Sequence, residues 1–92
     1  MAFRLDANEP NPFAGTTRIG YRLEEAMPVQ LSVFDAQGRE VRKFMTGYQE
    51  PGTHSLSWNG QDDAGRPVAS GVYWYVLQTP QGKLTRSLNL VR

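Results

Sequence analysis

The chain has 92 residues, no cysteine, and ten basic against nine acidic side chains, which leaves a net charge of +1. This length corresponds to one domain, and the lack of cysteine excludes a disulfide framework and a thiolate metal site. The two signs of charge are interspersed and no apolar run reaches the roughly 20 residues of a membrane span, so we expect neither nucleic acid as a partner nor a spanning segment. Residues 1–20 lack the apolar stretch of a signal peptide, so an exported form would be a piece of a larger protein.

In chain order, the first predicted element is a short edge strand at residues 3–5. A longer strand follows at 17–23, where apolar side chains occupy every second position, as in a strand with one buried face. After a short connection at 24–28, residues 29–34 alternate in the same way. A turn at 35–38 ends with glycine in its fourth position.

The middle of the chain is less regular. A strand at 41–45 is followed by a break at 48–52, which contains adjacent proline and glycine. Residues 53–58 again alternate polar and apolar side chains, and a long polar loop occupies 59–70.

Two last strands, at 72–79 and 84–91, are joined by a turn with proline second and glycine fourth, which predicts a hairpin. Short strands with turn signals about every 8–12 residues indicate an all-β fold, an immunoglobulin-like antiparallel β-sandwich of about seven strands in a single domain over residues 1–92. A barrel gives the same pattern and is the competing architecture. Tyr73 stands where such sandwiches place a corner tyrosine bonded to upstream backbone.

Catalytic groups are sparse. The only histidine, His54, is in phase with Leu56 and Trp58, so we interpret it as a partly buried strand residue. Its neighbour Ser55 points to the opposite face, which leaves no local dyad. Acidic neighbours at 24–25 and 62–63 lie on predicted loops, as solvated turn residues do. We therefore predict that the domain is not an enzyme.

The polar loop contains candidate metal ligands. Asn59, Asp62 and Asp63 supply oxygen atoms, the ligand type that calcium prefers. The loop lacks the alternating aspartates and the distal glutamate of a helix–loop–helix calcium site. Side-chain bonding within turns accounts for the same residues, so a calcium site and a plain turn both stay open, with the turn favoured and no other cofactor implied.

The strand at 72–79 has a second apolar face. If Tyr73, Tyr75 and Leu77 face the core, the alternate residues form an outward apolar stripe, which often marks a contact surface unless a loop covers it. The candidate partner contacts are Val72, Trp74, Val76, Arg86 and Arg92. Structural roles in the core and turns fall to Trp58, Tyr73, Tyr75, Gly65 and Gly71.

Short motifs over about residues 9 to 91 together resemble a known family. They are, in order, Asn11-Pro12-Phe13, Thr16-Thr17, Ile19-x-Tyr21-x-Leu23, Val33-Phe34-Asp35, Gly38-Arg39-Glu40-Val41, Gly52-x-His54-x-x-x-Trp58-x-Gly60, and Asp63-x-Gly65-x-Pro67-Val68-Ala69-Ser70-Gly71-Val72-Tyr73-x-Tyr75-x-Leu77. Their order and spacing resemble the C-terminal sorting domains, type A, of the type IX (Por) secretion system. The same pattern is similar to the immunoglobulin-like module of the flagellar hook-capping protein.

The resemblance implies a sandwich at the C-terminus of a larger exported bacterial protein. Such domains are recognised by the export machinery and are often cleaved when the cargo is attached, so the implied location is secreted or cell-surface and the implied partners are secretion or cell-envelope machinery. Recognition would involve the final hairpin, 71–92. Two departures are the end of the chain, 85–92, which lacks the lysine-rich strands of common members, and Asn59, where the family usually has aspartate.

Two other functions stay open. One is a carbohydrate-binding accessory module that grips polysaccharide through Trp74 and neighbouring tyrosines. The other is a structural assembly module of the hook-cap type. Fold likeness alone does not choose between these functions and sorting.

Overall fold

The structure, a computed structural model, describes residues 2–92, and the side chains of all of these except 45 and 46. Its strands are β1 (Phe3–Leu5), β2 (Thr17–Leu23), β3 (Met27–Phe34), β4 (Glu40–Gln49), β5 (Gly52–Trp58), β6 (Gly71–Thr79) and β7 (Gly82–Leu90). Residues 2–92 include no helix, and therefore none long and apolar enough to cross a membrane. The prediction of an all-β fold is confirmed.

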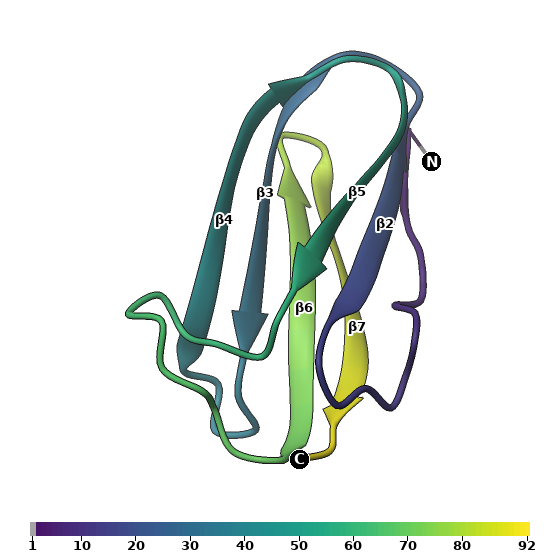
Figure 1. Cartoon of the computed structure of the whole chain (residues 1–92). Coiled ribbons are helices and arrows are strands. Elements are labelled where there is room, and N and C mark those ends of the chain that lie inside the picture. Colours follow the sequence, from purple (N-terminus) through teal and green to yellow (C-terminus); the bar gives the residue numbers. More distant parts are fainter. Residues whose placement is uncertain (1) are drawn as a thin grey trace.

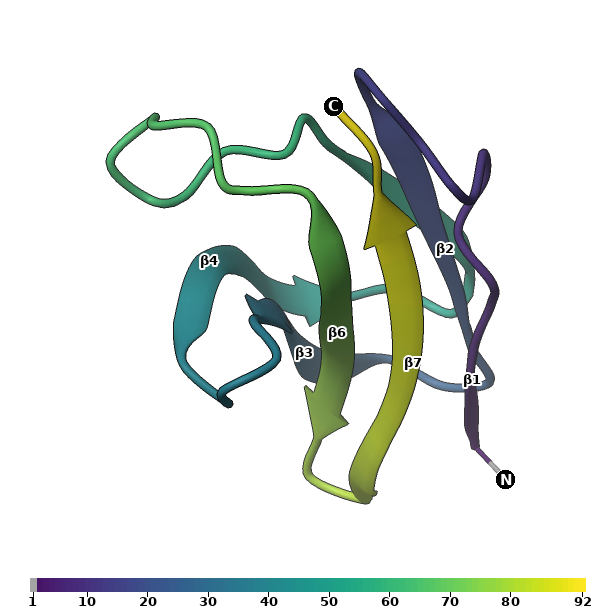
Figure 2. The same cartoon turned by 90° about the horizontal axis from the view of Figure 1, so that it is seen from below.

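The strands form two antiparallel sheets that pack face to face (Figure 1). One sheet has the order β1-β2-β5 and the other β4-β3-β6-β7. Seen from below, β1 of the first sheet lies beside β7 of the second, yet the two are not paired (Figure 2). Because each sheet keeps its own edges, the fold is the predicted immunoglobulin-like sandwich and not a barrel.

Alternation along β1, β2 and β6 places one face in the core. The alternation predicted over residues 29–34 is broken at Ser32 of β3, which is buried between Leu31 and Val33. In β2 every second residue from Thr17 to Leu23 is buried, and those between are exposed or half-buried. In β6 the predicted inward residues Tyr73, Tyr75 and Leu77 are buried, and so is Thr79 at the end of the strand. Each large apolar side chain buried in this way stabilises the fold by about 1.5–3 kcal/mol, so the facing rows hold the sheets together.

β5 and β6 each begin one residue before the predicted start, and β7 spans residues 82–90 where 84–91 was predicted. Two other strands extend further beyond their predicted bounds. The strand predicted at 29–34 begins at Met27 and includes Pro28, which is tolerated because β6 pairs with β3 only from Gln30 onward, so Pro28 has a strand neighbour on one side. The strand predicted at 41–45 runs from Glu40 to Gln49, because two shifts of register absorb its irregular residues while it stays paired with β3.

The segment between β1 and β2 covers part of a sheet edge. Phe13 forms a parallel bridge with the end of β7: its N–H donates to Asn89 O at 3.0 Å, and its carbonyl accepts from Val91 N at 2.9 Å. Asn11 Oδ1 accepts the N–H of Asn89 at 2.9 Å. The Phe13 ring is buried against Trp58, with ring centroids 5.7 Å apart. The Asn-Pro-Phe motif thus joins an edge cap to a core contact.

Candidate functional site

Two turns at one end of the sandwich share the pattern Asp-x-x-Gly-Arg, at residues 35–39 and 62–66. In each, the aspartate N–H donates to the arginine carbonyl, and its Oδ1 accepts N–H groups two and four residues later, all at 2.9–3.0 Å. Their glycines have φ of 84° and 81°, a left-handed conformation that glycine adopts without strain. The same sequence therefore builds the same turn twice.

The carboxylates of these turns are held in their ionised form. The pKa of Asp35 lies below its ordinary value chiefly because the Arg39 N–H donates to it, and the pKa of Asp62 is lowered in the same way by the Arg66 N–H. Each arginine adds an ion pair to its own aspartate, at 2.9 Å in the first turn and 3.5 Å in the second. These aspartates bind their own backbone and are not available as acid–base groups.

The three calcium candidates each accept main-chain N–H groups, as the turn aspartates do. Asn59 Oδ1 accepts the N–H of Gln61 at 3.2 Å, and Asp62 serves its own turn. Asp63 Oδ1 accepts from Lys43 N at 3.0 Å and from Arg42 Nη1 at 3.2 Å, which ties the loop to β4. Among the described residues no three acidic, histidine or cysteine side chains gather to hold a metal. The geometry is that of turns, and it gives the calcium interpretation no support.

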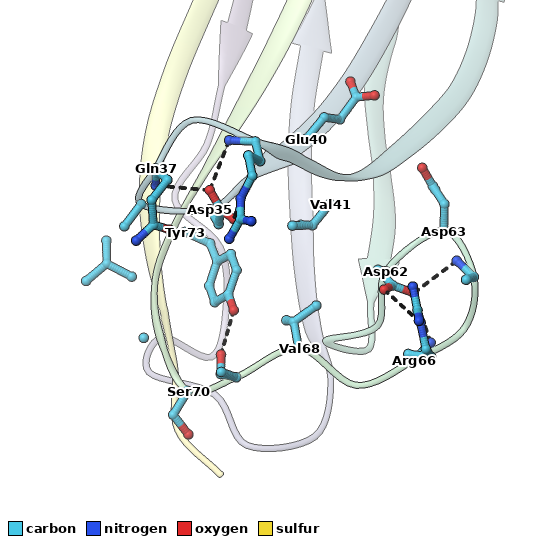
Figure 3. Close-up of a pocket in the computed structure, with 16 residues that line it drawn as sticks. Asp35, Gln37, Glu40, Val41, Asp62, Asp63, Arg66, Val68, Ser70 and Tyr73 are labelled. Carbon is cyan, nitrogen blue, oxygen red and sulfur yellow. Dashed lines mark hydrogen bonds and ion pairs between the residues drawn. The ribbon is translucent and has the colours of Figure 1, made fainter.

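An open groove of about 710 Å³ lies between the two turns (Figure 3). Val41 and Val68 lie between the side that carries Tyr73 and the side that carries Asp62. The Tyr73 hydroxyl donates to Ala69 O at 2.6 Å, the bond to upstream backbone that the corner hypothesis expects. Burial raises the pKa of this hydroxyl, so it stays protonated and keeps the bond. The groove is a polar-rimmed recess with a fixed wall.

Arg92 is bound within the fold. Its N–H donates to Ser70 Oγ at 2.9 Å, and its guanidinium donates to Val68 O at 2.7 Å and Gly60 O at 2.6 Å. Gly60 has φ of 74°, and a Cβ there would lie 2.6 Å from Arg92 Nη2. The residue predicted as a partner contact therefore pins the end of β7 to the loop between β5 and β6.

Arg86 and the core aromatics also have internal partners. Arg86 Nε donates to Leu5 O at 2.8 Å, across the gap between the two sheets. The Tyr75 hydroxyl crosses the same gap to Asp6 O at 2.7 Å. Trp58 is buried and donates its Nε1–H to Gln61 O at 2.9 Å, which fixes the start of the polar loop.

The outer face of the four-stranded sheet carries the predicted apolar stripe. Val72 and Trp74 are each 44% exposed, and Val76 is half-buried. Trp74 lies opposite the half-buried Phe34 of β3 on one side and Ser87 of β7 on the other. At this exposure no described loop covers the stripe.

The tyrosines next to Trp74 in sequence lie on the other side of the sheet. Tyr73 and Tyr75 are buried in the core, at 6% and 0% exposure. The carbohydrate hypothesis is therefore wrong in placing neighbouring tyrosines beside Trp74, because successive residues of a strand face opposite ways.

His54 has a structural environment. It is half-buried, stacks on Tyr21 with ring centroids 5.3 Å apart, and lies 2.7 Å from Glu50 O through Nε2. This confirms the interpretation of a partly buried strand residue. The described residues provide no serine–histidine–aspartate arrangement around it.

Two features were missed in the sequence. The repeated Asp-x-x-Gly-Arg pattern could have predicted the paired turns, because its aspartate, glycine and arginine recur at the same spacing. The edge cap made by Asn11 and Phe13 had no local signal, since its partners lie almost eighty positions later in the chain.

The comparisons with known proteins agree with this architecture. The model of the FlgD Ig-like domain matches residues 7–83. The chain belongs to the FlgD Ig-like domain family. FlgD from P. aeruginosa is similar to this FlgD-like domain at 29% identity and a TM-score of 0.64, over 80% of this chain and 58% of that one. FlgD from Xanthomonas campestris, described in the context of hook capping, is 20% identical, with a TM-score of 0.59, over 96% of this chain and 64% of that one.

Two proteins of Porphyromonas gingivalis share the fold. PorU matches 97% of this domain at 17% identity and a TM-score of 0.77, and PorZ, a surface component of the type IX secretion system, matches 94% at 22% identity and a TM-score of 0.66. The domain spans only 9% of the PorU chain and 11% of the PorZ chain, and less than two thirds of each FlgD chain. No curated protein sequence matches the chain.

Proposed function

We propose that this FlgD-like domain is a non-catalytic module for secretion sorting and cell-surface attachment of a larger extracellular bacterial protein. The observation that carries the proposal is the outer sheet face, where Val72 and Trp74 are exposed on β6, an inner strand of the four-stranded sheet. A lone exposed tryptophan beside a half-buried phenylalanine forms a contact patch that a partner protein would cover. The fold of PorU and PorZ, in which a domain of this size is a small part of a long chain, supports the choice of secretion machinery as the partner.

The chemistry of the end groove supports a non-catalytic role. Asp35, Asp62 and Asp63 each accept main-chain N–H groups, and His54 does not line the groove but stacks on Tyr21. A general base must be free to take a proton from a substrate. The three aspartates at the groove are occupied as acceptors, and Glu40 is the one described acid of its lining whose side chain has no hydrogen bond or ion pair.

The test fuses residues 1–92 to a reporter in a host with a type IX secretion system. We expect the reporter on the cell surface with the wild-type domain and a loss of at least about tenfold with Trp74→Ala, as for a central interface tryptophan. Tyr48→Ala is the matched control, because Tyr48 is an exposed aromatic residue, 70% accessible, on β4. Retention of the wild-type fusion inside the cell refutes sorting, and an equal effect of the two variants refutes the contact patch.

A second candidate is structural assembly of the hook-cap type. It is favoured by the 29% identity to FlgD from P. aeruginosa, the highest among the structures compared above. If this candidate holds, bacteria whose FlgD carries residues 1–92 in place of its own Ig-like domain should be motile. Motility together with failure of surface display would select assembly over sorting.

The same variants also test polysaccharide binding. Trp74 alone would have to supply the aromatic platform, since Tyr73 and Tyr75 are in the core. A glycan array on which wild type binds and Trp74→Ala does not would favour it over both protein-contact roles.

A further inference from the structure

Strand β7 is an edge strand that is capped over only part of its length. Asn89 directs its main-chain N–H and C=O away from β6, because Asn11 and Phe13 bind them. In an antiparallel pair, residues two apart direct these groups to the same side. Lys83, Thr85 and Ser87 therefore also point their N–H and C=O outward. No described residue makes a main-chain hydrogen bond to these groups on that side.

A recess of about 610 Å³ lies beside this free stretch, between β7 and β1. Figure 2 shows these two strands next to each other. Its apolar lining comes from Phe3, Leu5 and Leu84. Phe3 and Leu5 direct their backbone groups toward it as well, because the flanking Ala2 O and Asp6 N are the groups that bind the β2 side. On the β1 wall the Leu5 carbonyl already accepts from Arg86 Nε, so the longer run of free main-chain groups belongs to the β7 wall. Arg4, Glu24 and Arg86 complete the lining of the recess.

The remaining edges differ from this one. β4 is capped by the polar loop over residues 41–43, since Asp63 N donates to Val41 O at 3.0 Å and Asp63 Oδ1 accepts from Lys43 N. None of the described residues further along β4 lines either recess. The outer edge of β5 is uncapped over Thr53, Ser55 and Ser57, but it borders neither of the two recesses described above. Among the described strands, β7 is the one that combines a run of three residues with free main-chain groups and a recess for side chains.

We infer that the free edge of β7, residues 83–87, binds an extended segment of a partner protein as an additional strand. Only another extended main chain can satisfy N–H and C=O groups that alternate with strand spacing. The inward side chains of the added strand would lie next to Leu84 and Arg86, which are two residues apart on the inner face of β7.

The charges on β7 specify the partner further. Arg86 uses Nε to bind Leu5 O, and its two terminal nitrogens make no hydrogen bond to any described residue. Such nitrogens suit a carboxylate, which a guanidinium binds in a fork. The edge therefore fits a segment with an apolar residue and an acidic residue two positions apart. A second copy of the chain would instead oppose the same positive charges of Lys83 and Arg86.

This surface is not the Trp74 face, so the inference does not depend on the proposed function and the two can fail separately. The probe is a synthetic peptide with blocked ends, Ser-Thr-Val-Thr-Glu-Thr-Ser, added at millimolar concentration to the 92-residue domain. Amide hydrogen exchange followed by NMR reads the edge. In the free domain we expect fast exchange at Lys83, Thr85 and Ser87 and slow exchange at Leu84 and Arg86.

With the peptide, amide exchange at Lys83, Thr85 and Ser87 should slow by at least about tenfold, because each new hydrogen bond must open before its amide can exchange. A peptide N-methylated at alternate residues should lose this effect, and replacing its Glu by Gln should weaken binding about fivefold, the upper range for an exposed ion pair. Equal binding of the Glu and Gln peptides would overturn the acidic preference.

Proline variants separate the two uncapped edges. Thr85→Pro removes an outward N–H and no β6 bond, and should abolish the slowing, while Ser55→Pro, its counterpart on β5, should not. Slow exchange at all three β7 positions before peptide is added, slowing at the β5 edge instead, or no slowing at all would each overturn the inference.

Discussion

Gly60 and Arg92 should be energetically coupled, because one leaves the space that the other fills. Alanine at position 60 would hold a φ of 74° and place its Cβ 2.6 Å from Arg92 Nη2. The left-handed backbone costs about 1–2 kcal/mol for an L-residue. Displacing the guanidinium loses its bonds to Gly60 O and Val68 O, worth about 1 kcal/mol after allowing for solvent exposure. Gly60→Ala should therefore reduce the free energy of unfolding by about 2–3 kcal/mol.

The coupling appears in a double-mutant cycle. Arg92→Ala alone should cost about 1 kcal/mol, and in that background Gly60→Ala should cost only its backbone strain. The double variant should then be about 1 kcal/mol more stable than the sum of the single effects predicts. Gly65→Ala is the matched control, since Gly65 has φ of 81° and nothing within 4 Å of the added Cβ. Its cost should be strain alone and should add to that of Arg92→Ala.

Urea denaturation followed by tryptophan fluorescence gives the required free energies, and thermal melting should show the Gly60→Ala midpoint about 10–20 °C below wild type. Additive effects of Gly60→Ala and Arg92→Ala, within about 0.3 kcal/mol, would refute the reasoning. So would equal costs for alanine at positions 60 and 65.

Two further outcomes follow from the end groove. Tyr73→Phe should lower the free energy of unfolding by about 1 kcal/mol, because it removes the donor to Ala69 O. The loss stays near this value because Ala69 is exposed and water can replace the donor. An unchanged melting midpoint would count against the corner bond. Asp62→Asn keeps the Oδ1 acceptor but removes the charge. Since the folded-state pKa of Asp62 is depressed, the stabilisation from its charge is present above the ordinary value of 3.8 and is lost as the pH falls through the lower folded value. Melting midpoints measured through this acidic range should therefore fall less steeply for Asp62→Asn than for wild type, and parallel curves would contradict the assignment.

Local periodicity was sufficient for most of the fold. The inward row of Tyr73, Tyr75 and Leu77 and the outward Val72 and Trp74 follow from the period of two, because successive strand residues must face opposite sides. The last hairpin also follows from local chemistry, since proline and glycine occupy the two turn positions that favour them, and β6 ends at Thr79 while β7 begins at Gly82. Strand ends were less accurate where register shifts and a proline lengthened β3 and β4.

Side-chain partners far along the chain were beyond such reasoning. Arg86 and Arg92 look like free basic contacts in the sequence, yet both donate to main-chain carbonyls once the sheets pack. No local pattern encodes which carbonyl a long, flexible side chain will reach, because that depends on how two distant strands are brought together.

The sequence by itself determined the strands, their faces and most of the turns, since these depend on residues within a few positions of one another. The tertiary structure decided which strands pair into which sheet, which edges are capped, and which charged groups stay free. Those outcomes depend on contacts between segments separated by tens of residues, and the free edge of β7 is visible only after Asn11 and Phe13 have covered the rest of it.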